Sequence, residues 1–246
     1  MNADQSSQPL LSARAVSKRF GANTVLNSVD FHVHAGQAVG IVGPNGAGKT
    51  TLLATLSGSL AADAGSVWLR GQDVTALDAA QRCRQGVARS HQVPRPFGGM
   101  TVFENVLTAA MQGGGFRRHE AYDRAIDAID LCGMAAVANR RAESLGLLDR
   151  KRLELTRSLA TNPAILLLDE IGGGLTDGEA AELVHTIRTL HARQITIVWI
   201  EHIVHVLVQV ARRLICMDAG QIIADGTPDE VLSNATVVDA YLGGQR

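Results

Sequence analysis

The chain has 246 residues, of which 46% are apolar, so it can bury one large core or a core with a helical lobe. Its formal net charge of -1 gives no electrostatic reason to expect nucleic acid as a partner. The 3 cysteines are widely spaced and form no C-x-x-C pair, so neither a disulfide framework nor a zinc site is indicated.

Two stretches of the sequence are candidates for a secretion signal or a membrane span, and neither has the required pattern. Residues 1–9 are polar and lack the apolar segment that is typical of a signal peptide. The apolar stretch 195–210 is interrupted by Glu201, His202 and His205, whereas a membrane span needs about 20 mostly apolar residues. If the protein serves a membrane, we expect it to dock on a membrane partner.

The first part of the chain alternates strand and helix patterns. Residues 29–33 alternate like a half-buried strand, and residues 38–42 form an apolar run that is typical of a buried strand. A helix is expected over residues 49–57 and a strand over 66–69. The sequence Thr75-x-x-Asp predicts a helix start at Thr75, and residues 87–90 suit a short strand that leads to Gln92.

The middle of the chain predicts a helical insertion. Proline and glycine breaks occur between residues 94 and 99 and again at residues 113–115. Apolar side chains recur at helical spacing at Tyr122, Ile126 and Ile129, which predicts that this stripe packs into the core. We therefore expect a helical subdomain over residues 93–160, inserted into a core made of residues 1–92 and 161–246.

The last part returns to strands. Residues 164–168 and 195–200 predict buried strands, and Thr176-x-x-Glu179 predicts a capping box that opens an amphipathic helix. Residues 214–217 and 221–224 flank Asp218-Ala-Gly, a hairpin signal. Continuously apolar strands that alternate with helices predict an α/β fold with a largely parallel sheet.

A glycine-rich motif follows the strand at residues 38–42. It reads Gly43, Pro44, Asn45, Gly46, Ala47, Gly48, Lys49, Thr50, and Thr51 comes next. Such a loop wraps backbone N–H groups around phosphates, and the following helix adds its N-terminal dipole. Lys49 should reach the β- and γ-phosphates, and Thr50 should ligate Mg²⁺. The alternative is a structural glycine turn.

A second motif ends the buried strand at residues 164–168. Asp169 suits a Mg²⁺ ligand, and Glu170 suits a general base or water-orienting group for attack on a γ-phosphate. An acidic pair after a strand can also be a solvated loop. Together with the glycine-rich motif, it predicts an ATPase that uses ATP and Mg²⁺.

Over nearly its whole length the chain resembles ABC-transporter ATPases. The resemblance implies a P-loop core, a small antiparallel β subdomain and a helical subdomain. It implies that Gln92 contacts Mg²⁺ and the attacking water, that His202 contacts the γ-phosphate, and that Phe20 stacks on adenine. For Phe20 the alternative is ordinary core packing.

Within that family the chain looks like the ATP-binding subunits of branched-chain amino acid importers. The similar stretches are residues 43–51, 100–106, 225–231 and 240–243. This likeness implies a second ATPase chain, two transmembrane permease subunits, an external solute-binding protein and a peripheral position on the cytoplasmic face of the membrane. Amides, urea or aromatic acids are alternative solutes.

One loop departs from the family pattern. The family signature is L-S-G-G-Q, whereas this chain has Leu145-Gly-Leu-Leu-Asp149. In the family this loop completes the partner's ATP site, so we expect an asymmetric heterodimer, with a homodimer as the alternative. Asp149 is predicted to cap the helix that begins there. A regulatory chain that holds ATP with little hydrolysis, a non-transport ABC ATPase and a small-molecule kinase remain as other hypotheses.

Overall fold

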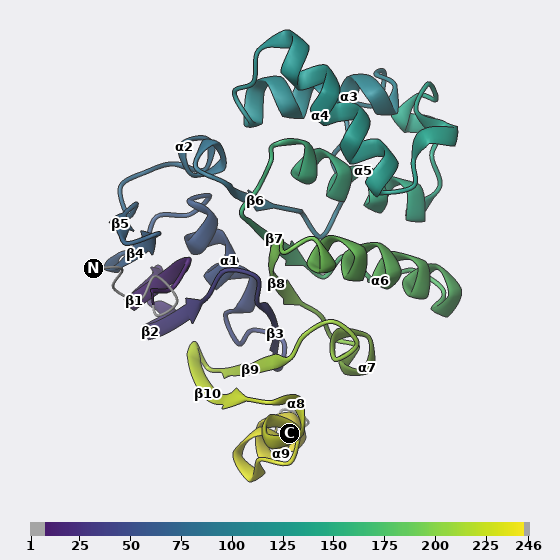
Figure 1. Cartoon of the computed structure of the whole chain (residues 1–246). Coiled ribbons are helices and arrows are strands. Elements are labelled where there is room, and N and C mark those ends of the chain that lie inside the picture. The colour runs from purple at the N-terminus through teal and green to yellow at the C-terminus, as the bar shows by residue number, and fades with distance from the viewer. Residues whose placement is uncertain (1–7, 244–246) are drawn as a thin grey trace, which may run out of the picture.

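A six-stranded, mostly parallel sheet forms the centre of the molecule (Figure 1). The computed structural model describes residues 8–243; the remaining ten residues of the predicted core, 1–7 and 244–246, lie outside the described part. All neighbouring strands run parallel except the edge strand β10, which pairs antiparallel with β9. In spatial order the strands are β10 (Gln221–Gly226), β9 (Arg213–Asp218), β3 (Ala38–Val42), β8 (Thr196–Ile200), β7 (Ile165–Asp169) and β6 (Val87–Arg89).

A smaller antiparallel sheet covers one face of the central sheet. Its order is β2 (Asn23–Val33), β1 (Leu11–Phe20), β4 (Ala64–Leu69) and β5 (Gln72–Asp73). Helix α1 (Lys49–Ser57) lies between the two sheets and contributes Leu52, Leu53 and Leu56 to the core that joins them. The small antiparallel sheet was implied by the family resemblance, and the structure contains it.

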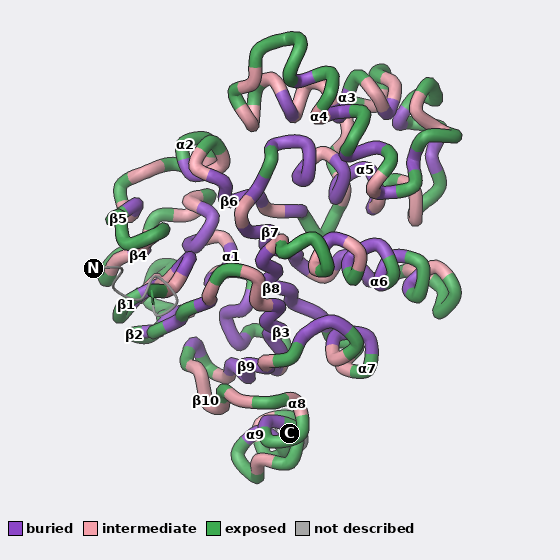
Figure 2. The backbone as a smooth tube through the Cα atoms, viewed as in Figure 1, coloured by how far each residue is buried: buried purple, intermediate pink, exposed green. Residues whose placement is uncertain are grey.

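Helices cover the opposite face of the central sheet. Along β7, Ile165 and Leu167 face the core with α1, whereas Leu166 and Leu168 face the core with α6 (Asp177–Ala192). Because side chains alternate along a strand, a strand buried on both faces is apolar on both, as residues 165–168 of β7 are before the strand ends at Asp169. Figure 2 shows this burial running through the central strands while the outer helix turns stay exposed.

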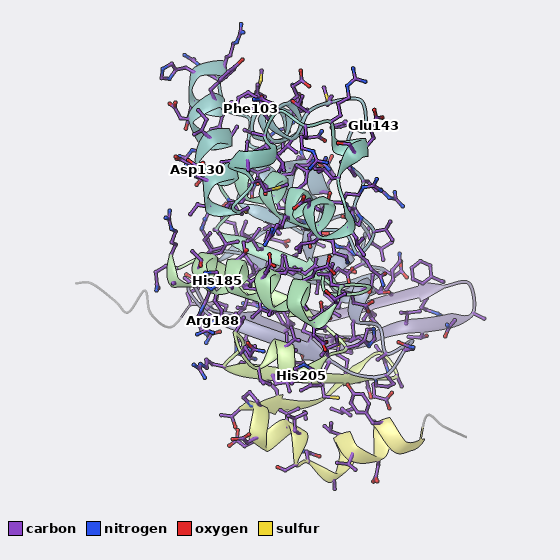
Figure 3. All side chains as sticks on the ribbon, turned by 90° about the vertical axis from the view of Figure 1, so that its right-hand side faces the viewer. Phe103, Asp130, Glu143, His185, Arg188 and His205 are labelled. Carbon is purple, nitrogen blue, oxygen red and sulfur yellow. The ribbon has the colours of Figure 1, made fainter. Side chains whose placement is uncertain are left out.

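Residues 102–160 form a helical layer beside the central sheet, at the top of Figure 1. Figure 3 shows this layer, marked by Phe103, Asp130 and Glu143, above α6, marked by His185 and Arg188. Its helices are α3 (Val102–Thr108), which continues into one π-helical turn (Ala109–Gly113), α4 (Arg118–Leu131) and α5 (Leu147–Ala160), with short 3-10 turns at Ala135–Val137 and Ala142–Ser144.

The predicted apolar stripe of α4 is wrong at two of its three positions. Tyr122 and Ile126 are 36% and 48% exposed, whereas Ile129 is buried. The buried face of the helix is made mainly of alanines: Ala121, Ala125 and Ala128. Small side chains let α4 approach α3 and α5 closely, so the core lies on a neighbouring face of the same helix.

Helix caps decide where several other elements begin. Thr176 caps α6 with Glu179, as predicted. The prediction that a helix begins at Thr75 is wrong: α2 (Ala79–Arg84) begins after Asp78, which forms a capping box with Gln81. Thr75 instead accepts a hydrogen bond from the backbone of β4. The chain continues through α7 (Val204–Leu207), α8 (Pro228–Leu232) and α9 (Ala235–Gly243). No helix within residues 8–243 is long and apolar enough to span a membrane.

Candidate active site

The glycine-rich loop connects the end of β3 to the start of α1, as predicted. Gly43, Gly46 and Gly48 all have positive φ angles, at 142°, 83° and 98°. A Cβ atom on Gly43 would lie 2.0 Å from the Met217 carbonyl oxygen, and one on Gly48 would lie 2.7 Å from the Val25 carbonyl oxygen. Two of the three glycines are therefore required by space as well as by conformation.

A hollow of about 170 Å³ lies against this loop. The backbone at the start of α1 faces it, and the first N–H groups of a helix have no partner within the helix. The hollow is lined by Val25, Asn45, Gly46, Ala47, Gly48, Lys49, Thr50, Thr51 and Glu170. Pro44 and Gly43 belong to the loop but do not line the hollow. The backbone N–H groups at the start of α1, together with Lys49, suit an anion such as a phosphate chain.

The Lys49 ammonium lies across the loop. Its Nζ donates to the carbonyl oxygens of Gly43 at 2.7 Å and Pro44 at 2.9 Å. Burial lowers the pKa of Lys49, and the nearby carboxylate of Glu170 is the largest influence in the opposite direction. A cation held this way, at the edge of a hollow with free N–H groups, can compensate the charge of a bound triphosphate.

Asp169 ends strand β7 and is almost fully buried, at 1% exposure. Its Oδ1 accepts a hydrogen bond from the Thr50 hydroxyl at 3.1 Å, so two of the three predicted metal ligands meet, whereas the third, Gln92, contacts Glu170. A hydroxyl and a carboxylate oxygen are the hard ligands that Mg²⁺ takes when phosphates and waters complete its coordination. The donors present therefore fit Mg²⁺. The other oxygen, Oδ2, pairs with Arg89 at 2.7 Å, a partner that sequence reasoning missed.

Glu170 gathers two further predicted residues. Its Oε2 accepts from Gln92 Nε2 at 2.5 Å, and its Oε1 lies 2.7 Å from His202 Nε2. Glu170 itself has a left-handed backbone, with φ of 48°, a conformation that non-glycine residues adopt rarely and often at functional sites. Three segments far apart in sequence therefore place a carboxylate, an amide and an imidazole at the edge of the phosphate hollow.

Glu201 supports the loop that follows Glu170, a role that the sequence did not suggest. Its side chain is buried, and Oε1 accepts from the Gly172 backbone N–H at 2.6 Å. Burial raises the pKa of Glu201, and the bond from Gly172 opposes that shift. A Cβ at Gly172 would lie 2.9 Å from Oε1, so the glycine allows this close approach.

The C-terminal helix also reaches the glycine-rich loop. The Gly43 N–H donates to the Tyr241 hydroxyl at 2.8 Å, although 198 residues separate the two in sequence. The stretch around Tyr241 was noted in the sequence for its family likeness alone. A hydroxyl on an apolar C-terminal helix gives no local signal of this contact, because it depends on where α9 packs.

Phe20, the residue expected to stack on adenine, does not line the phosphate hollow. It ends β1 and is 51% exposed, so ordinary core packing does not explain it. The Lys18 ammonium lies 5.7 Å from its ring centroid, and Phe20 is not among the residues that line the phosphate hollow. Its ring is accessible to a planar group, but the structure does not bring it against the glycine-rich loop.

The segment Leu145-Gly-Leu-Leu-Asp149 opens helix α5. The helix begins at Leu147, and Gly146 stands at its N-cap with no side-chain hydrogen bond. The prediction that Asp149 caps the helix is therefore wrong: it is the third helical residue and lies 3.8 Å from Arg152. The N-cap is Gly146, with an extended backbone, so the helix begins three residues earlier than a cap at Asp149 would place it. Leu147 is 45% exposed.

A glycine loop between a parallel strand and a helix, with a lysine at the helix start and two carboxylates at the end of strand β7 in the same sheet, defines a P-loop nucleotide-binding ATPase. Residues 26–172 match the family model described as ABC transporter, and residues 221–246 match the model described as Branched-chain amino acid ATP-binding cassette transporter. The chain belongs to the ABC transporter family, as its ATP-binding and ATP-hydrolysing subunit.

Two curated relatives and one solved structure illustrate the likeness. The high-affinity branched-chain amino acid transport ATP-binding protein LivG of Escherichia coli K12 is 37% identical, with 96% of this chain and 99% of the relative covered. BraF of Pseudomonas aeruginosa, with the same description, is 33% identical over the same shares. The ADP conformation of MJ1267, an ATP-binding cassette of an ABC transporter, has a TM-score of 0.86 and 30% identity, with 96% of this chain and 100% of that chain covered.

Proposed function

We propose that this chain hydrolyses MgATP to energise import of branched-chain amino acids or related small polar solutes. The observation that carries the proposal is the placement of Glu170, held by Gln92 and His202, at the rim of the phosphate hollow. The names of the relatives LivG and BraF support the solute class. A triphosphate bound in the hollow would have its γ-phosphate within reach of the Glu170 carboxylate.

Each residue then has a physical role. The amides of the glycine-rich loop and Lys49 bind the phosphates, and Phe20 stacks on adenine. Thr50 and Asp169 hold Mg²⁺, assisted by Gln92; when bound, the ion neutralises phosphate charge. Glu170 orients the attacking water and accepts its proton, while His202 offsets charge that develops on the γ-phosphate.

A groove of about 410 Å³ suggests where a permease docks. Its walls come from α2, β6, the π-helical turn and α5, and include Cys83, Arg95, Phe97 and Gln112. Phe97 is 49% exposed at this groove, with the Arg157 guanidinium 5.3 Å from its ring centroid, and would offer an aromatic surface to a partner. Gln92, which contacts Glu170, is followed along the chain by Arg95 and Phe97, which line this groove. An occupant of the groove would therefore touch the same segment of the chain as Gln92.

The groove supports a permease subunit as partner, and the likeness to LivG and BraF supports a transporter with two permease subunits and an external solute-binding protein. The chain would then lie peripherally on the cytoplasmic face of the membrane. We also propose the division into a core, residues 1–92 and 161–246, and a helical subdomain, residues 93–160. The helical layer is joined to the core at β6 and at α5, which are the two ends of that insertion.

We further propose that the working ATPase is an asymmetric pair with a second ABC ATPase chain. Gly146 offers no hydroxyl, and the exposed Leu147 side chain occupies the start of α5. The family's signature loop reaches the partner's γ-phosphate, so this loop would serve the partner's site poorly. The site made by this chain's own P-loop would be completed by the partner's intact signature.

Reconstitution tests the function and the asymmetry together. The wild-type chain should bind MgATP, and hydrolysis should rise greatly when the second ATPase chain of the same transporter is added. Lys49→Ala in this chain should abolish that rise. Failure of the wild-type chain to bind nucleotide would remove the ATPase proposal. Equal hydrolysis per P-loop with and without the second chain would remove the asymmetry alone.

A regulatory chain that holds ATP with little hydrolysis is the second candidate. The observation in its favour is the same loop, which lacks a polar side chain at the N-cap of α5. A single-turnover assay on the reconstituted pair separates the two candidates, because a regulatory site would retain its ATP while a catalytic site converts it to ADP.

A further inference from the structure

Arg89 is a largely buried cation next to the carboxylate that we propose as a Mg²⁺ ligand. It is the last residue of β6, and its guanidinium lies 2.7 Å from Asp169 Oδ2. The two side chains are 11% and 2% exposed. Within the described residues, Asp169 is the carboxylate that Arg89 pairs with, and the Nε of Arg89 has no hydrogen-bond partner. The proposed mechanism above leaves Arg89 without a role.

Asp169 is therefore engaged on both sides. Its Oδ2 faces Arg89 from β6, and its Oδ1 accepts from Thr50 at the start of α1. A buried carboxylate without a counter-ion is costly, so Arg89 stabilises the protein before any metal arrives. The same positive charge opposes a divalent cation at Thr50 and Asp169, because like charges a few ångströms apart repel strongly where water is excluded.

We infer that Arg89 is an internal counter-ion of Asp169, a positioning residue that sets the Mg²⁺ concentration at which the site loads. The inference rests on the proposed function, in which Asp169 holds Mg²⁺. Removing the guanidinium has two linked effects of opposite direction: the metal-free protein becomes less stable, and Mg²⁺ binds more tightly. A residue with a purely structural role would change stability equally with and without the metal.

Two measurements on the full chain test this inference. The first is the thermal unfolding midpoint with saturating non-hydrolysable ATP analogue, with and without Mg²⁺. The second is the Mg²⁺ concentration that gives half-maximal stabilisation. In Arg89→Ala we expect a lower midpoint without Mg²⁺, much of it recovered by Mg²⁺, and a half-maximal concentration about tenfold lower, which corresponds to about 1.4 kcal/mol.

Three further variants make the result specific. Arg89→Lys keeps the charge and should keep the Mg²⁺ requirement near that of the wild type. Arg89→Gln keeps a donor without the charge and should show the same lower Mg²⁺ requirement as Arg89→Ala. It therefore carries the test if the alanine variant does not fold. Arg213→Ala removes an ion pair of similar length but greater exposure, to Asp225 at 2.6 Å across β9 and β10, and should destabilise equally with and without Mg²⁺.

The outcomes separate the inference from the proposed function. Equal destabilisation of Arg89→Gln with and without Mg²⁺, or a half-maximal Mg²⁺ concentration that is unchanged or higher, overturns the counter-ion role. If the wild type gains no stability from nucleotide and Mg²⁺ together, the proposed function fails instead.

Discussion

Replacing Glu170 by glutamine tests the chemistry at the rim of the phosphate hollow. The substitution keeps the shape of the side chain and leaves one oxygen to accept from Gln92 or His202, which both contact the carboxylate in the wild type. It removes the group that would accept the proton of the attacking water. General base catalysis contributes roughly 10²- to 10⁴-fold in rate, so the barrier should rise by about 2.7 to 5.4 kcal/mol.

The affinity for ATP should not fall with the hydrolysis rate in this variant. Glu170 lines the hollow, and its negative charge opposes a triphosphate there. Glutamine removes that charge, so Glu170→Gln should bind ATP at least as tightly as the wild type while it turns ATP over much more slowly. Single-turnover hydrolysis and equilibrium binding measured on the same reconstituted preparation check both halves.

A matched control is available on α6. Glu182→Gln makes the same chemical change at a side chain that is 58% exposed and pairs with Arg152. That variant should hydrolyse ATP at the wild-type rate, because exposed ion pairs contribute little. Glu170→Gln turnover within about tenfold of the wild type, or a marked loss of ATP binding, would refute the assignment of Glu170 as the base.

Two further substitutions test the loop and a helix cap. Gly43→Ala places a carbon 2.0 Å from the Met217 carbonyl oxygen, whereas a Cβ at Gly46 meets no atom within 4 Å. In urea unfolding we expect Gly43→Ala to lose about 3 kcal/mol or more and Gly46→Ala about 1 to 2 kcal/mol; equal losses would contradict the steric argument. Thr176→Ala removes the cap of α6 and should cost about 1 kcal/mol at pH 7. Hydrogen bonds from Thr176 lower the pKa of Glu179 below its usual value of 4.5. The stabilisation that these bonds to the Glu179 carboxylate give the folded protein is therefore present above pH 4.5 and is lost as the pH falls through the lowered pKa. The unfolding difference between Thr176→Ala and the wild type should therefore narrow in acid, and a constant difference would show that the carboxylate takes no part.

Local sequence was sufficient for most strands and for the loop between β3 and α1. Residues 38–42 and 49–57 are predicted with the bounds that the structure has, because continuous apolar runs and positive-φ glycines are properties of neighbouring residues. The same holds for the Thr176 cap. The prediction of a helix start at Thr75 is wrong because the Thr75 hydroxyl accepts a hydrogen bond from the backbone of β4, and Asp78 caps α2 instead.

Periodicity has a second limit. It identifies which residues of a helix share a face, but it does not say which face another element covers. In α4 the side chain of Ile126 is exposed and that of Tyr122 is only partly covered, by Phe103 of α3, because α3 and α5 pack mainly on the alanine face. Similarly, the sequence did not show that α5 begins after Gly146 rather than after Asp149.

The sequence by itself determined the class of protein, since a glycine-rich loop with its lysine and an acidic pair after a strand are contiguous motifs whose chemistry follows from spacing. Only the tertiary structure decided what each charged group contacts. Arg89 meets Asp169 across 80 residues, and Gln92 meets Glu170 across 78, because strand order places β6 beside β7. Such pairings depend on the arrangement of the whole sheet, and no segment of the chain encodes that arrangement locally.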